Sequence, residues 1–262
     1  MRVFSNYARM IGTFAVGIYI MRRLLTVDPS LFSIYMLVTV GLGVGMMMRE
    51  ALRIALVSFS RAETTGSSVD LESRFRQGLG CAVAWIGIHL TIVVLLSTTA
   101  NSLTFDERFA SQFGPFVLLR GLGYSMLIIS VPYLNMLAYE GRMVAYNAWL
   151  LVERLADLLV FEAIVWTTET HGESELVLGG MCYVATSALI LCSLVTSRSL
   201  SRLRRLQFRP TRLTGESKRV LLSSISGSGL LVVTMALHFR FSLLVINALF
   251  GEGVGIAYAV AV

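Results

Sequence analysis

Charged residues are scarce in this chain. Asp, Glu, Lys and Arg make up 15% of its 262 residues, whereas apolar residues make up 55% and the mean hydropathy is +0.73. Soluble globular domains carry about 25% charged residues. The composition therefore excludes a soluble globular protein and predicts a chain whose main surroundings are lipid.

Reactive and metal-binding side chains are also few. The three cysteines lie within apolar stretches and show no C-x-x-C spacing, so we expect small packing residues and neither a disulfide nor a metal site. The sequence has three histidines and lacks P-loop, G-x-S-x-G and H-E-x-x-H motifs. We therefore expect no cofactor and no enzymatic activity; His171, beside Glu169 and Glu173 in a polar loop, leaves an intramembrane enzyme as an alternative.

Seven apolar stretches divide the chain, and each is long enough for a spanning helix, which needs about 20 mainly apolar residues. The loops between them alternate in Lys and Arg content, from none in 167–175 to eight in 197–219. By the positive-inside rule, the N-terminus and the turns after the second, fourth and sixth helices face the cytoplasm of a multi-pass inner-membrane protein. The predicted helices are 7–27, 31–59, 78–99, 116–139, 143–166, 176–197 and 220–250.

The fold class that follows is all-α and transmembrane, in two parts joined by a linker. Residues 1–198 form a six-helix N-terminal lobe, 199–219 form a basic cytoplasmic linker, and 220–262 begin a second lobe. The net charge of +6 lies mainly in loops where anionic headgroups are found, so we assign it to membrane topology and expect contact with membrane lipids, not with nucleic acid. The chain ends within the apolar run 257–262, so we expect it to be truncated relative to a larger transporter.

Three arginines are predicted to gather in the first helical hairpin. With the turn at Pro29, Arg9 lies level with Arg49, and Arg53 shares the helix face of Arg49 at i, i+4 spacing. Only Glu50 is close enough to neutralise them. Because guanidinium groups bind phosphate in a bidentate manner, the cluster is a candidate diphosphate site; the alternative is that these arginines extend to the lipid headgroups.

Other ionisable residues inside the predicted helices need partners, because each costs roughly 2.5 to 3.5 kcal/mol to insert. A turn near Gly141 puts Arg120 level with Glu162, and we predict a structural ion pair between them. Arg240, in the seventh helix, is predicted to face the first lobe across a wet cleft and to contribute to the diphosphate site.

The fifth predicted helix carries the densest group of charges. Glu153 and Asp157 share a face, and Arg154 lies between them in sequence. We expect a structural cluster in which these charges neutralise one another, and proton or cation coupling by Glu153 and Asp157 is the alternative. His89, alone in the third helix, is predicted to be a hydrogen-bonded core residue.

Three segments resemble a known family of transporters. The opening of the chain (6–10 and 23–35) is similar to that of polysaccharide-biosynthesis flippases, and 49–56 resembles the Arg-Glu-Ala-x-Arg-x-Ala run of dolichol-oligosaccharide flippase relatives. The segments 246–251 and 255–259 are similar to an Asn-x-Phe-Phe-Gly then Ala-Ala-Tyr segment of bacterial polysaccharide exporters. The resemblance is to the multidrug/oligosaccharidyl-lipid/polysaccharide exporter superfamily, and it implies two six-helix lobes with a cationic cleft lined by Arg9, Arg49, Arg53 and Arg240.

The function that the resemblance implies is a flippase that moves a polyprenyl-diphosphate-linked oligosaccharide across the membrane by alternating access. The expected partners are the lipid-linked oligosaccharide and glycosyltransferases or a polymerase of the same pathway. A cation-coupled multidrug or metabolite antiporter, with Glu153 or Asp157 as the coupling acid, is the alternative.

Overall fold

The computed structural model describes residues 2–43, 49–50, 52–53, 71–99, 107–171 and 176–196, together with Gly215 and Leu249. These residues form six α-helices. They are α1 (Arg2–Val27), α2 (Pro29–Gly41), α4 (Leu71–Thr98), α5 (Glu107–Tyr139), α6 (Met143–His171) and α7 (Leu176–Thr196).

The prediction of an all-helical protein is confirmed for the described residues. Each of these helices overlaps one of the first six predicted stretches, but several bounds differ. Helix α1 begins at Arg2 instead of 7, α2 ends at Gly41 instead of 59, and α6 continues to His171 instead of ending at 166. Helix α4 begins at Leu71 instead of 78, and α5 begins at Glu107 instead of 116. Hydropathy marks only the apolar part of a helix, and both helices start with polar turns that hydropathy does not detect. The linker 199–219, the second-lobe segment 220–262 and Arg240 lie outside the described residues, apart from Gly215 and Leu249.

Among the described residues, four helices are long and apolar enough to cross a membrane, which indicates a multi-pass membrane protein. These candidate spans are Phe4–Val27, Phe75–Thr98, Phe109–Tyr139 and Leu176–Thr196. Helix α6 is of similar length, at 29 residues. It differs by its charges, since it carries Glu153, Arg154, Asp157 and Glu162. Helix α6 therefore carries a dense group of ionisable side chains, between residues 153 and 162.

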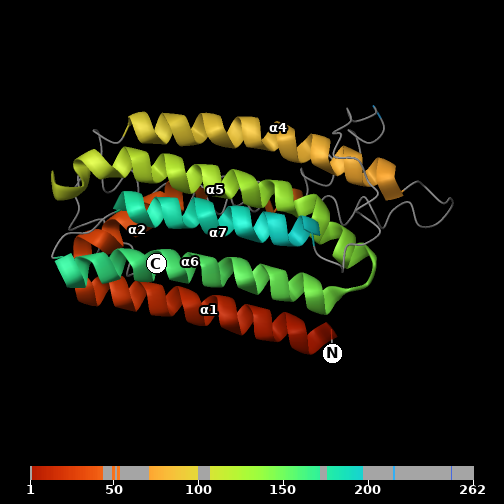
Figure 1. The fold of residues 1–262 in the computed structure, drawn as a ribbon, viewed down its shortest axis with the longest axis horizontal. Helices are drawn as coiled ribbons and strands as arrows, with labels where there is room; N and C mark the ends of the chain where they lie inside the picture. Colours follow the sequence, from red (N-terminus) through yellow and green to blue (C-terminus); the bar gives the residue numbers. More distant parts are fainter. Residues whose placement is uncertain are drawn as a thin grey trace.

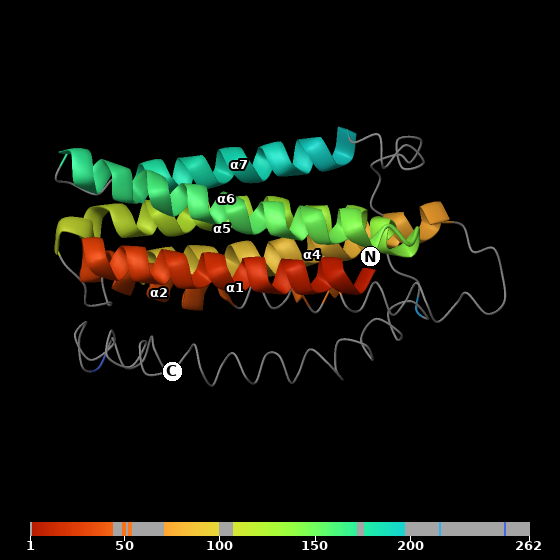
Figure 2. The same cartoon turned by 90° about the horizontal axis from the view of Figure 1, so that it is seen from below.

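The helices lie side by side with nearly parallel axes (Figures 1 and 2). Helix α5 is the centre of the packing: α4 and α7 lie against it, and 72% of its span is buried, against 11% for α1. Helix α1 packs along α6 at the side of the bundle (Figure 1). Ser5 contacts Asn147 and Arg23 contacts Glu169, so these two helices run parallel.

The turn between α5 and α6 has a defined C-terminal cap. Gly141 has a φ of 76°, in the left-handed region that glycine adopts without strain. The amide of Arg142 donates to the carbonyl of Leu137, and that of Gly141 to the carbonyl of Ala138, which is a Schellman motif. This cap reverses the chain at once and fixes α5 and α6 as antiparallel neighbours.

Candidate functional site

The centre of the candidate site is a buried ion pair between Arg49 and Glu153. Arg49 Nη2 donates to both carboxylate oxygens of Glu153, at 2.6 and 2.7 Å, and the two side chains are 11% and 7% exposed. Arg49 Nε also donates to the carbonyl oxygen of Leu127 on α5, at 3.0 Å. The Arg49 guanidinium, which was predicted to bind diphosphate, is therefore satisfied inside the protein by Glu153, which was expected to belong to a structural cluster of charges.

Arg53 has a different environment, closer to the surface. Its Nε donates to Glu50 Oε2 at 2.7 Å, and its Nη1 donates to the hydroxyl of Tyr146 on α6. The side chains of Arg53 and Glu50 are 21% and 43% exposed. Arg9 lies within electrostatic range of the Tyr146 hydroxyl, and its Nε is buried without a hydrogen-bond partner among the described residues. Among the described residues, Tyr146 thus lies within electrostatic range of two arginines and one carboxylate, Glu50.

Arg120 is paired with a different carboxylate from the one expected. We predicted a pair with Glu162, but Arg120 Nη2 lies 3.3 Å from Asp157 Oδ1. The expectation matched the two residues by depth and ignored their direction around the helix. At 100° per residue, Glu162 points roughly 140° away from Asp157. It instead accepts a hydrogen bond from Tyr19 of α1.

Aromatic rings surround the Arg120 guanidinium, which is 3% exposed. Its Cζ lies 4.1 Å from the ring centre of Tyr183, 5.2 Å from that of Phe161 and 5.6 Å from that of Tyr124. A cation over an aromatic face gains about 0.5 to 2 kcal/mol. Its Nε and Nη1 nevertheless have no hydrogen-bond partner in the described part of the chain. Arg120 is therefore stabilised mainly by rings and one carboxylate.

Asp157 is shared between two arginines. Besides the contact with Arg120, its Oδ2 lies 3.5 Å from Nη1 of Arg154. Arg154 is also within electrostatic range of Tyr124, Tyr183 and Arg49, which links all of these charges into one network. In this arrangement both candidate coupling acids, Glu153 and Asp157, are occupied by guanidinium groups, so a coupling cation has to displace an arginine.

His89 is a core residue, as predicted. It is fully buried, and its Nε2 lies 3.2 Å from the carbonyl oxygen of Gly121 on α5. Its role in the fold is to join α4 to α5.

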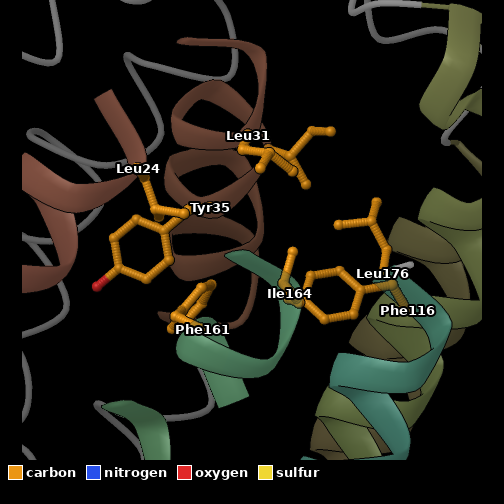
Figure 3. Close-up of a pocket in the computed structure, with 8 residues that line it drawn as sticks. Leu24, Leu31, Tyr35, Phe116, Phe161, Ile164 and Leu176 are labelled. Carbon is orange, nitrogen blue, oxygen red and sulfur yellow. The ribbon is translucent and has the colours of Figure 1, made fainter. Parts of the chain in front are cut away.

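A small pocket lies beside the charged network. It is lined by residues of α1, α2, α5, α6 and α7, and its volume of about 10 Å³ is room for about one water molecule. Figure 3 shows the Tyr35 hydroxyl pointing away from Phe116 and Leu176. The pocket is too small and too apolar for a phosphate or a sugar. Its lining residues are Leu24, Leu31, Ile34, Tyr35, Phe116, Phe161, Ile164 and Leu176.

The sequence reasoning did not identify several polar residues of the site. Ser130 contacts both members of the central pair, Tyr146 contacts Arg53, and Tyr183 stacks on Arg120. These residues carry no charge, so neither the cost of insertion nor a motif marks them. For tyrosine the available signal was weak, because tyrosine is common in membrane proteins and is enriched at the membrane–water interface.

The charged residues do not form a metal site in the described part of the chain. No group of three or more His, Cys, Asp or Glu side chains lies together there. Arginines instead accompany every carboxylate of the network, so the chemistry that this arrangement suits is the binding of anions. Comparisons of the chain with protein-family models, with curated proteins and with solved structures found no match.

Proposed function

We propose that this chain is a membrane transporter that carries a lipid-linked oligosaccharide across the membrane by its diphosphate group. One observation carries the proposal: Arg9 and Arg53 both act on the Tyr146 hydroxyl, at the end of the bundle that holds the α5–α6 turn, and among the described residues Glu50 is the carboxylate that acts on the same hydroxyl. An arginine pair with one carboxylate leaves a positive charge for a ligand. The positive-inside rule assigns this end to the cytoplasm, where a lipid-linked precursor would be loaded.

Glu50 occupies the place that a phosphate oxygen would take. Its Oε2 accepts hydrogen bonds from Arg53, and the pair is formed within one helix at i, i+3 spacing near the surface. Both side chains are partly buried, and ion pairs near the surface contribute about 0 to 1 kcal/mol, so an incoming phosphate can displace this carboxylate at little cost. The exchange keeps the charge-assisted hydrogen bonds of Arg53 while releasing Glu50 to water.

The membrane potential can drive this transport. An inside-negative potential favours outward movement of anions by about 2.3 kcal/mol per charge per 100 mV. A headgroup with two phosphate charges gains roughly 4 to 5 kcal/mol at that potential. Alternating access between this lobe and a second one would convert the gain into net export.

Arg49 and Arg53, two of the four arginines predicted for the site, have to be tested separately. Removing Arg49 leaves Glu153 as a buried, unpaired charge, which destabilises a protein by about 3 to 5 kcal/mol whatever its function. Arg53 is half-buried and contacts Glu50, so its removal mainly affects the ligand site. Arg53→Ala is therefore the informative variant, and Arg23→Ala, at the opposite end of the bundle, is its matched control.

The experiment measures binding of undecaprenyl diphosphate to the purified full chain in detergent. We expect Arg53→Ala to weaken binding at least tenfold, which corresponds to the loss of about 1.4 kcal/mol. We expect Glu50→Gln to strengthen binding and Arg23→Ala to leave it unchanged. Unchanged binding by Arg53→Ala would overturn the proposal. Efflux of a lipid-free compound that collapses with a proton or sodium gradient would point instead to the antiporter.

A further inference from the structure

Arg154 is a half-buried charge at a depth where lipid is expected. It is the twelfth residue of α6, so it lies roughly 16 Å along the helix from Met143. The hydrocarbon core of a bilayer is about 30 Å thick, which places this position well inside it. The Arg154 side chain is nevertheless 39% exposed. A guanidinium exposed to hydrocarbon at this depth is strongly unfavourable, so its surroundings have to be polar.

The lipid-facing side of α6 is a different one. Val152, Leu155 and Leu159 are 41%, 43% and 62% exposed and form an apolar stripe along the helix. Arg154 points roughly 100° to 160° away from these residues around the helix axis. It shares a face with Leu151 and Asn147, which contact Gly12 and Ser5 of α1. The exposed part of Arg154 therefore lies on the α1 side of the helix and not among the lipid chains.

The charges around Arg154 do not balance. In the described part of the chain the network contains three arginines and two carboxylates, a difference of one positive charge, and Asp157 is shared between Arg154 and Arg120. Arg120 is 3% exposed, and two of its nitrogen atoms have no hydrogen-bond partner among the described residues. An excess charge in a medium of low dielectric constant favours the uptake of an anion.

We infer that Arg154 faces a water-filled path within the membrane and, with Arg120 behind it, forms an anion site at half depth that takes a pyrophosphate group. The identity of the anion rests on the proposed function, but the exposure of Arg154 to water does not. The site would hold the diphosphate after it leaves Arg53 and before it reaches the opposite end of the bundle. It is a second site, because Arg53 contacts Glu50 and Tyr146, whereas Arg154 contacts Asp157.

Exposure to water is tested with thiol reagents that do not cross membranes. Arg154→Cys is introduced into the full chain after replacement of Cys81, Cys182 and Cys192 by Ala, and the protein is placed in lipid vesicles. Leu159→Cys is the matched control, because it lies on the lipid-facing stripe one and a half turns away. We expect the thiol at position 154 to react about tenfold faster or more, because only a thiol in water forms the reactive thiolate. Equal, slow reaction at both positions would overturn the inference.

Anion binding is tested separately in the full chain. Inorganic pyrophosphate and undecaprenyl diphosphate are each titrated against Arg53→Ala, alone and combined with Arg154→Gln or Arg154→Lys. We expect Arg154→Gln to weaken the remaining binding about tenfold and Arg154→Lys to retain most of it, since lysine keeps the charge. Weaker binding of the lipid alone would identify the lipid-linked group as the ligand, and weaker binding of both probes would identify a general pyrophosphate site.

The anion site at Arg154 and the proposed function can be overturned independently of each other. A reactive thiol at position 154 with no effect of Arg154→Gln on either probe would leave a water path and overturn the anion site. An unreactive thiol together with a large effect of Arg53→Ala would overturn the deeper site and leave the proposed function in place.

Discussion

Arg49 and Glu153 are 104 residues apart in the sequence, and their side chains meet with nitrogen–oxygen distances of 2.6 and 2.7 Å. The pair joins the first helical hairpin to α6 in the interior of the bundle. Since both side chains are nearly buried, each neutralises a charge that the low-dielectric surroundings would otherwise not tolerate. The pair therefore stabilises the fold, and a variant that removes one partner loses stability as well as any function of that residue.

The first prediction concerns this pair. Arg49→Ala and Glu153→Ala should each destabilise the protein by about 3 to 5 kcal/mol, because each leaves an unpaired buried charge. The double variant should cost clearly less than the sum, since it buries no charge. Denaturation in detergent measures the free energy of unfolding of the wild type, the two single variants and the double variant. Additive costs in this double-mutant cycle would show that the side chains do not interact.

The second prediction concerns Arg23 and Glu169, which lie 2.8 Å apart at the other end of α1 and α6. Their side chains are 35% and 47% exposed, so solvent screens the pair. Replacing either residue by Ala should cost about 1 kcal/mol or less, and the cost should fall further at high salt. The same denaturation assay at low and high salt checks this, and a cost as large as that of Arg49→Ala would contradict it.

The third prediction concerns the contact between α5 and α7. A Cβ atom at Gly123 would lie 2.5 Å from Cδ1 of Tyr183, whereas at Gly17 of α1 no heavy atom lies within 4 Å. Gly123→Ala should therefore destabilise the bundle by about 1 to 3 kcal/mol. Gly17→Ala should be neutral or stabilising, since alanine has the higher helix propensity. Thermal unfolding of both variants tests the contact, and equal melting temperatures would argue against it.

The fourth prediction concerns orientation. The start of α1 and the α5–α6 turn lie at the same end of the bundle, because Ser5 contacts Asn147. A reporter that is active only in the cytoplasm should therefore be active when fused after Gly141 and inactive when fused after His171. The opposite result would invert the topology and would put the Arg53 site on the outer side.

The helices were largely predictable, and their lateral neighbours were not. Apolar stretches of about 20 residues specify spanning helices because lipid cannot satisfy backbone hydrogen bonds. Gly141 marked the turn that caps α5. The parallel packing of α1 against α6 has no signal in hydropathy, because side chains facing lipid and side chains facing another helix are equally apolar.

For the candidate site as well, one part was predictable from the sequence and another part was not. Residue type and hydropathy identify the ionisable residues inside the membrane that need partners: Arg49, Arg120, Glu153 and Asp157 all follow from the cost of an unpaired charge in lipid. Their pairing depends on how the helices are arranged around one another. Depth along a helix can be counted from residue numbers, but the direction around the helix acquires meaning only when the neighbours are placed. For that reason Arg120 meets Asp157 and not Glu162, and Arg49 meets Glu153.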